Sequence, residues 1–248
     1  MDFPTSQAPL AGAKIVVVGG TNGIGKAVAL SLAKEGASLF ICGRDPERLA
    51  EAIAEIQKIG GVVHGAAADI ARAHDIQTLF ASADAALSGL DACICAAALG
   101  LRGDVDASGD EWRRVLETNF NGTIACVREA ASRMKKRQSG HIVIIGSMSA
   151  EVWEEGSSHY VATKGGLRAF AGCVRKELDP LGVGVTLIEP GATATDMQPG
   201  SPASLQEQIR QHEMLSPNDV AETIVFVLTR PQRCRVVTMQ LRPQLQLI

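Results

Sequence analysis

The sequence predicts an α/β fold, a doubly wound sheet of about seven parallel strands flanked by helices on both faces. Short apolar segments alternate with segments of helical length, which is the pattern of repeated β-α-β units. The composition agrees, because 46% of the 248 residues are hydrophobic and only 4% are aromatic, so the core is aliphatic. Aliphatic strands covered on both sides are typical of parallel sheets. A chain of this length fills one such core, so we expect a single domain over residues 1–248.

The predicted strands are short apolar runs rich in valine, isoleucine and alanine. They cover Lys14–Val18, Ser38–Cys42, Val62–Ala67, Asp91–Ala96, His141–Ile145, Val183–Ile188 and Arg235–Gln240. The helices between them run to about Lys34, over Pro46–Ile59, to about Ala86, over Glu111–Lys136, over His159–Asp179, and onward from Pro217. Ser216 precedes the last of these helices and has the character of its N-cap.

Residues 191–215 form the one long irregular stretch that the sequence predicts. Pro199, Gly200 and Pro202 lie near its middle. A loop of this length in a compact domain is usually functional or disordered, and we expect a substrate lid here.

Composition and charge exclude several classes of protein. The net charge of −3 argues against nucleic acid or an anionic membrane as a partner. No apolar run reaches the roughly 20 residues that a membrane helix needs, and Met1–Thr5 shows no start of a secretory signal. The six cysteines are scattered without a Cys-x-x-Cys, and the five histidines lack metal-ligand spacing. We therefore expect reduced thiols, no metal site and a cytoplasmic location.

A glycine-rich turn, Val18–Gly25, follows the first strand and opens the first helix. Glycine lets the backbone approach a pyrophosphate closely, and the helix N-terminus offers free N–H groups and the positive end of its dipole. Such turns also serve tight packing alone, but this position between strand and helix indicates a nucleotide site. The turn residues expected to contact the nucleotide are Gly19, Thr21, Asn22, Gly23, Ile24 and Gly25.

The end of the second strand indicates which dinucleotide is bound. A carboxylate there would bind the ribose hydroxyls of NAD(H) and repel the 2′-phosphate of NADP(H). The sequence instead has Gly43 followed by Arg44, and arginine is a good phosphate clamp. Asp45 competes for the carboxylate role, although it is better explained as the N-cap of the helix that begins at Pro46. We expect NADP(H) to be favoured over NAD(H), the alternative for Arg44 being an ordinary surface arginine.

Tyr160 is the only tyrosine of the chain, and Lys164 follows it by four residues. If this segment is helical, the phenol and the ammonium share one face of the helix. A nearby cation favours phenolate, so the pair is predicted to lower the tyrosine pKa from its ordinary value of about 10. A phenol tuned in this way can act as acid or base near neutral pH.

These features together resemble the short-chain dehydrogenase/reductase family over about Ala11 to Leu241. Four motifs carry the resemblance. The glycine-rich turn matches Gly-x-x-x-Gly-x-Gly at Gly19, Gly23 and Gly25, and Asn119 matches an asparagine that interrupts a long central helix. Ser147 lies thirteen residues before the Tyr-x-x-x-Lys of Tyr160 and Lys164, and Pro190–Thr195 matches Pro-Gly-x-x-x-Thr. There are two departures, Val18 where threonine is usual and Cys95–Ala98 where Asn-Asn-Ala-Gly is common. These departures alter hydrogen bonds at the bottom of the expected cofactor site, but they remove no side chain that transfers a proton.

The resemblance implies a Rossmann-type fold and a function for each motif. Tyr160 would be the general acid in carbonyl reduction and the general base in alcohol oxidation, and Lys164 would bind the nicotinamide ribose and lower the phenol pKa. Ser147 would bind the substrate oxygen, and Asn119 would hold a water that links Lys164 to solvent. Further cofactor contacts are expected from Asp69 (to adenine, unless it is a helix cap), Ile70, Ala96, Pro190, Gly191, Thr193 and Thr195. The family also implies a homotetramer that buries Glu111–Lys136 and His159–Asp179.

Three functions remain open at this point. The first is an NADP(H)-dependent oxidoreductase of a small or medium polar carbonyl or alcohol, because the lid is polar apart from Met197 and Leu205. The second is an NAD-dependent sugar or polyol dehydrogenase with Asp45 as the ribose ligand. The third is a nicotinamide-dinucleotide-binding sensor without turnover, against which the full Ser-Tyr-Lys set argues. The adjacent Glu154 and Glu155 either disfavour anionic substrates or are solvated loop charges.

Overall fold

The structure, a computed structural model, describes residues 10–100, 103, 105 and 109–246. The prediction that Met1–Thr5 begins no secretory signal therefore concerns residues outside this part. The strands form one seven-stranded sheet in the order β3-β2-β1-β4-β5-β6-β7, and every neighbouring pair is parallel, as predicted. The strands are β1 Lys14–Val18, β2 Ser38–Gly43, β3 Val62–Ala67, β4 Ala92–Cys95, β5 Gly140–Ile145, β6 Val183–Pro190 and β7 Thr238–Leu241.

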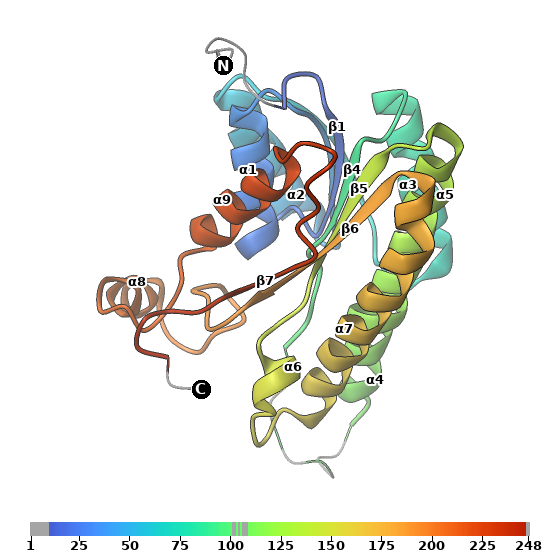
Figure 1. Ribbon diagram of the computed structural model, residues 1–248. Helices are drawn as coiled ribbons and strands as arrows, with labels where there is room; N and C mark the ends of the chain where they lie inside the picture. Colours follow the sequence, from blue (N-terminus) through green and yellow to red (C-terminus); the bar gives the residue numbers. More distant parts are fainter. Residues whose placement is uncertain (1–9, 101–102, 104, 106–108, 247–248) are drawn as a thin grey trace, which may run out of the picture.

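Helices cover both faces of this sheet (Figure 1). One face carries α1 (Gly23–Lys34), α2 (Pro46–Lys58) and α9 (Pro217–Leu228), and the other carries α3 (Ala73–Leu87), α5 (Thr123–Arg137) and α7 (Ser158–Leu178). The shorter elements are α4 (Glu111–Leu116), η1 (Glu117–Gly122), α6 (Ser149–Val152), η2 (Asp179–Leu181) and α8 (Pro202–Arg210).

Each face of the sheet is the floor of its own hydrophobic core. Along β1, Ile15 and Val17 face the layer of α1, α2 and α9, while Val16 and Val18 face the layer of α3, α5 and α7. This alternation follows from the two-residue period of a strand, and burial on both faces explains why the strands are continuously apolar. The second core also holds four free cysteines, Cys42, Cys93, Cys95 and Cys126. Burial raises the pKa of Cys42 to about 12, which leaves this thiol unreactive.

The strand order places a switch point between β1 and β4. The chain moves outward from β1 through β2 to β3, and then returns to lay β4 against the other side of β1. The carboxyl ends of β1 and β4 therefore diverge into helices on opposite faces, which opens the crevice where ligands of doubly wound sheets bind. The glycine-rich turn and the segment that begins at Ala96 both lie at this edge.

The long central helix is not regular. The predicted Glu111–Lys136 consists of α4, a π-helical segment η1 and α5, so the helix is interrupted around Asn119, as the resemblance implied. Close packing accompanies the interruption, since a Cβ placed on Gly122 would lie 2.4 Å from the carbonyl oxygen of Ile70. The wider π turn and the absence of a side chain let the chain after β3 lie against this helix.

The prediction that residues 191–215 are irregular is wrong in part, because α8 lies within them. Ser201 caps this helix by accepting a hydrogen bond from the Ser204 amide, and Pro202 occupies its first turn. Proline has no N–H to lose at that position, so Pro202 starts a helix here instead of breaking one. Ser216 caps α9 with a complete capping box, as predicted. The last strand begins at Thr238 rather than Arg235, and α6 was not predicted.

Within the described part of the chain, each helix is too short or too polar to cross a bilayer. The same residues contain no group of three or more His, Cys, Asp and Glu side chains placed to hold a metal ion.

Candidate active site

The glycine-rich turn is folded so tightly that side chains would collide within it. Gly19 has a φ of +82°, and a Cβ on it would lie 2.6 Å from the Ala97 backbone. A Cβ on Gly25 would lie 2.0 Å from the carbonyl oxygen of Gly19. The amides of Gly19 and Gly20 both donate to the Cys42 carbonyl, at 3.0 and 2.9 Å, and this anchors the turn to β2. The bare backbone that results is what a pyrophosphate requires for close approach.

Helix α1 begins in this turn and directs its N-terminus at the crevice. Asn22 is the N-cap, and its side-chain oxygen accepts from the Gly23 amide at 2.8 Å. The first turn of α1 itself contains no acidic residue. Asn22 also donates to Asp196 at 2.7 Å, and Arg48 binds the same carboxylate oxygen at 3.2 Å. This contact, which the sequence did not predict, ties the segment after Pro190 to the turn.

The adenosine end of the site lies at the carboxyl ends of β2 and β3. Thr21 packs against Gly43, where a Cβ would lie 2.4 Å from the Thr21 hydroxyl. Arg44 follows Gly43 and is exposed, whereas Asp45 caps α2 by accepting from the amides of Glu47 and Arg48 at 2.9 and 3.2 Å. The carboxylate of Asp45 is therefore engaged in the role that the sequence favoured for it.

Asp69 is held by the protein itself. Its carboxylate accepts from Arg114 at 2.6 Å and from the Ala71 amide at 3.1 Å. These contacts lower its pKa, although partial burial acts in the opposite direction and is the largest single influence. Asp69 is not the cap of α3, because Arg72 occupies that position. A contact between Asp69 and adenine stays a prediction.

The remaining predicted cofactor residues line the same edge of the sheet. Ala96 donates its amide to the Val18 carbonyl at 2.9 Å, which continues the pairing of β4 with β1. The Thr193 hydroxyl donates to the Gly191 carbonyl at 3.0 Å. The Thr195 methyl would lie 3.1 Å from a Cβ on Gly23, so the segment after Pro190 reaches back over the turn. Ile24 is part of the first turn of α1, and Ile70 contacts Gly122 as described above.

Ser147, Tyr160 and Lys164 meet beside this crevice. Ser147 follows β5 and is buried, while Tyr160 and Lys164 lie on the first turns of α7. The Tyr160 phenol lies near the Ser147 side chain, which favours the phenolate form. The Lys164 ammonium lies 5.5 Å from the centroid of the Tyr160 ring and donates to the Ile145 carbonyl at 2.9 Å. The structure thus brings together the three side chains that the motif spacing selected.

The predicted lowering of the Tyr160 pKa does not hold in the chain itself. Burial raises the pKa of Tyr160, the neighbouring Ser147 side chain opposes the rise, and the nearby Glu154 carboxylate adds to it. The sequence places Lys164 on the same helix face but does not determine which atoms meet. In the structure the ammonium lies over the ring and binds a carbonyl. Burial also lowers the pKa of Lys164 to about 8, with Glu189 acting against the fall.

Asn119 is buried in η1, and its side chain is engaged on both sides. Its oxygen accepts from the Leu99 amide at 2.7 Å, and its nitrogen donates to the Leu99 carbonyl at 2.8 Å. The side chain therefore fixes the segment that follows β4, at whose start Cys95–Ala98 stand in place of the common Asn-Asn-Ala-Gly. A water held between Asn119 and Lys164 stays a prediction.

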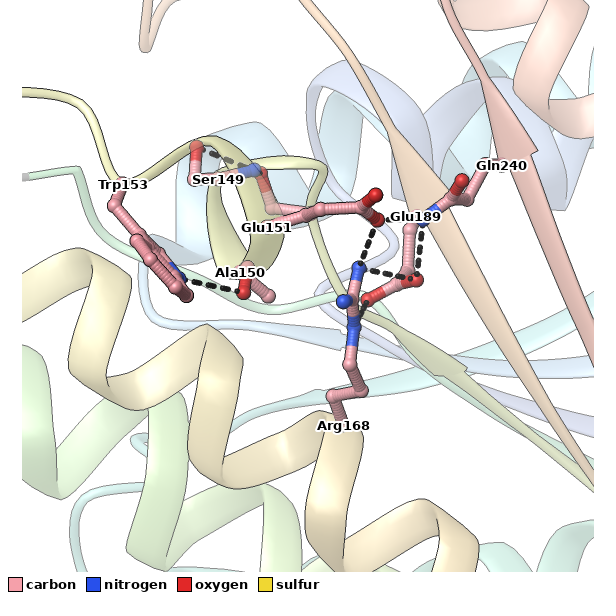
Figure 2. Close-up of polar contacts among 8 residues, drawn as sticks. Ser149, Ala150, Glu151, Trp153, Arg168, Glu189 and Gln240 are labelled. Carbon is pink, nitrogen blue, oxygen red and sulfur yellow. Dashed lines mark hydrogen bonds and ion pairs between the residues drawn. The ribbon is translucent and has the colours of Figure 1, made fainter.

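Two further side chains near the site, those of Ser149 and Glu189, are not among the predicted site residues. Ser149 accepts from Ser147 at 3.0 Å and donates to Glu154 at 3.0 Å, so a chain of hydroxyls leads from the site to an exposed carboxylate. Glu189, at the end of β6, binds Arg168 of α7 (Figure 2). A carboxylate at the end of a strongly hydrophobic run, directly before Pro190, was the signal that could have revealed it.

A dinucleotide fits these residues. The turn offers bare backbone and a helix N-terminus to a pyrophosphate, Arg44 stands at the adenosine end, and the Ser147–Tyr160–Lys164 cluster lies where a nicotinamide would follow. The doubly wound fold, the glycine-rich turn and the adjacent Ser147–Tyr160–Lys164 cluster together indicate the class of dinucleotide-binding oxidoreductases.

Comparison with known proteins identifies the family within this class. The profile of the short chain dehydrogenase family matches residues 13–206, and the chain belongs to the short-chain dehydrogenase/reductase family. An uncharacterized oxidoreductase of Staphylococcus aureus strain MW2 is 31% identical over 92% of this chain and 96% of its own length. A metagenomic short-chain oxidoreductase solved in complex with NADP superimposes with a TM-score of 0.83 at 25% identity, over 96% of this chain and 100% of that one.

A second solved structure has a similar fold and cofactor. A short chain dehydrogenase from Burkholderia cenocepacia J2315, also in complex with NADP, has a TM-score of 0.83 at 27% identity, over 94% of this chain and 98% of that chain. The protein is thus an oxidoreductase that uses a nicotinamide dinucleotide.

Proposed function

We propose that this protein interconverts a small or medium polar carbonyl compound and the corresponding alcohol, with NADP(H) as the cofactor. The observation that carries the proposal is the meeting of Ser147, Tyr160 and Lys164 beside the glycine-rich turn. When bound, the nicotinamide dinucleotide supplies or accepts the hydride, while the protein supplies position and charge. A panel of carbonyls and alcohols, followed by NADPH absorbance, tests the proposal. It would be rejected if no compound in the panel caused oxidation of NADPH or reduction of NADP.

Tyr160 is the proton donor in the reduction direction. Its raised pKa keeps the phenol protonated at neutral pH, which is the form that protonates the substrate oxygen. Ser147 lies near the phenol, and its hydroxyl stabilises the charge that develops on that oxygen. Lys164, with a pKa of about 8, is mostly an ammonium at neutral pH and binds the nicotinamide ribose.

Arg44 supports NADP(H) as the cofactor. It is exposed directly after β2, where the 2′-phosphate of the adenosine would lie, and Asp45 is engaged in capping α2. The two solved relatives described above, each in complex with NADP, point the same way. In an NAD-dependent sugar or polyol dehydrogenase, Asp45 would have to bind the ribose hydroxyls and give up its hydrogen bonds to the first turn of α2.

Arg44→Ser is expected to weaken NADPH binding by about ten- to a hundredfold. A hydrogen bond to a charged group contributes about 1.5–3 kcal/mol, and serine cannot replace the guanidinium. NADH has no 2′-phosphate, so its affinity for the same variant serves as the control and should hardly change. Calorimetric titration with both cofactors gives the ratio. If NADH bound the unaltered protein more tightly than NADPH, the proposed role of Arg44 would be wrong.

The loop after β5 supports a substrate without negative charge. Glu154 accepts from Ser149, which is bound to Ser147, and the Glu154 carboxylate acts on Tyr160. A fixed carboxylate near the reacting oxygen repels an anionic substrate, although its exposure weakens the effect through solvent screening.

We propose that residues 1–248 act as one domain in the cytoplasm, with residues 191–215 as the substrate lid.

We also propose a homotetramer that buries the outer surfaces of α5 and α7, which lie in one layer (Figure 1). This proposal comes from the family alone. Light scattering of the purified protein is expected to give four times the mass of one chain, which is 26.1 kDa. A monomer across the concentration range used for activity would overturn it.

A further inference from the structure

A buried carboxylate, that of Glu189, lies beside the backbone that leads into Ser147. Glu189 is the seventh residue of β6, and only 1% of its surface is exposed. A carboxylate in such an environment destabilises the fold unless it is paired with a positive charge and hydrogen-bonded. Its partners therefore determine what it does.

Arg168 of α7 is the direct partner of Glu189 (Figure 2). Its Nε binds one carboxylate oxygen at 2.7 Å and its Nη2 binds the other at 3.0 Å. This bidentate arrangement is the strong form of an arginine–carboxylate pair. The same Nη2 contacts Glu151 at 3.1 Å, and Gln240 donates to both carboxylates, at 2.7 Å to Glu151 and 3.3 Å to Glu189.

The Glu189 side chain also lies in the surroundings of Lys164. Lys164 and Arg168 are four residues apart on α7 and share one helix face. The Lys164 ammonium donates to the Ile145 carbonyl, and a Cβ on the next residue, Gly146, would lie 3.0 Å from the Glu189 Cγ. The buried amine and the buried carboxylate thus approach the same short segment of backbone, directly before Ser147. Charges that interact through a protein interior are screened far less than charges in water.

We propose that Glu189 is a positioning residue for Lys164: its carboxylate is the buried countercharge of the Lys164 ammonium, and Arg168 moderates that charge. Glu189 raises the pKa of Lys164 against the lowering caused by burial, in agreement with this geometry. The inference rests on the proposed function only in that Lys164 belongs to the active site.

Other charges near α7 are already engaged. Glu151 of α6 is exposed and bound to Arg168 and Gln240. On α4 and η1, Arg113 pairs with Asp110, Arg114 with Asp69, and Glu117 with Asn121, while Glu111 is exposed at the start of α4. Among the described residues, Glu189 is the charged group that acts on the Lys164 ammonium, while the Tyr160 ring covers it from its own helix.

Two single variants distinguish this role from a purely structural one. Glu189→Gln removes the negative charge and leaves Arg168, so the Lys164 midpoint should fall from about 8 by about one pH unit. Arg168→Gln removes the positive charge and leaves Glu189, so the midpoint should rise by about as much. The double variant should return it close to the original value. A structural contact between β6 and α7 would instead make both single variants behave alike, because each breaks the same pair.

The midpoint is measured by NMR of isotope-labelled lysine side chains in the full-length protein, with the Lys164 signal assigned by its loss in Lys164→Met. Glu151→Gln is the matched control: it removes another carboxylate bound to Arg168, one that is exposed, and should leave the midpoint almost unchanged. The alkaline limb of the activity profile should move in the same direction as each NMR midpoint. Shifts of equal sign in the two single variants, or no shift in either, would overturn the proposal. If Arg168→Gln does not fold, because it leaves the buried Glu189 carboxylate without its positive partner, Glu189→Gln decides alone, since a structural role predicts no fall in the Lys164 midpoint.

Failure of this inference and failure of the proposed function give different results. Opposite NMR shifts in a protein that turns over no carbonyl would support the role of Glu189 and reject the function. Turnover of a carbonyl by a protein whose Lys164 midpoint is unchanged in both variants would support the proposed function and reject the role of Glu189.

Discussion

Tyr160→Phe is expected to reduce turnover by on the order of a hundred- to ten-thousandfold, which is the usual contribution of a general acid or base. Phenylalanine keeps the ring over which the Lys164 ammonium lies, and it loses only the phenol hydroxyl. Affinity for NADPH should therefore change little. Steady-state kinetics with the best carbonyl of the panel, together with cofactor titration, measure both quantities.

The single tyrosine of the chain provides an independent check of the same residue. Ultraviolet titration of the unaltered protein reports phenolate formation at Tyr160 alone, and the signal should disappear in the variant. We expect its midpoint above the ordinary value of about 10, because burial raises the pKa. Undiminished turnover in Tyr160→Phe would reject the acid–base role of Tyr160.

Gly19→Ala is expected to weaken cofactor binding by at least about tenfold and to destabilise the fold. The new methyl group would lie 2.6 Å from the Ala97 backbone, so the turn must shift away from β4. The shift misplaces amides that donate to the pyrophosphate, and each hydrogen bond to a charged group contributes about 1.5–3 kcal/mol. Cofactor titration and thermal unfolding measure the two effects.

Gly60→Ala is the matched control for this substitution. Gly60 has the same φ of +82°, but a Cβ there would have nothing within 4 Å. The control therefore reports the left-handed backbone penalty alone, about 1–2 kcal/mol, with no effect on the cofactor. Equal cofactor affinity in the two variants would show that the packing of Gly19 against Ala97 does not shape the site.

Most of the sheet could be predicted because each strand is a local pattern. Apolar runs such as Val183–Ile188 are short, and the helices between them carry their own caps at Asp45 and Ser216. The error at Pro202 has a local cause as well. The same rule that places proline in the first turn of α2 and α9 applies to α8, but the neighbouring Pro199 and Gly200 indicated a loop.

The candidate site was predicted in its membership but not in its electrostatics. The spacing of Ser147, Tyr160 and Lys164 selected three residues that the structure brings together. The direction of the Tyr160 pKa could not follow from that spacing, because it depends on burial and on Glu154, which approaches from a separate loop. The pairing of Arg168 with Glu189 joins residues 21 positions apart and was equally hidden.

The sequence by itself determined the alternation of strands and helices and the bare glycine turn, since these depend on neighbours within a few residues. Its motif spacing also selected Ser147, Tyr160 and Lys164 as the candidate site. Only the tertiary structure decided that β4 lies beside β1, that the Lys164 amine binds the Ile145 carbonyl, and that a buried carboxylate lies behind it. The physical reason is that desolvation and charge act through space. The groups that set the protonation of Tyr160 and Lys164 come from strands and loops that the chain brings together only when it folds.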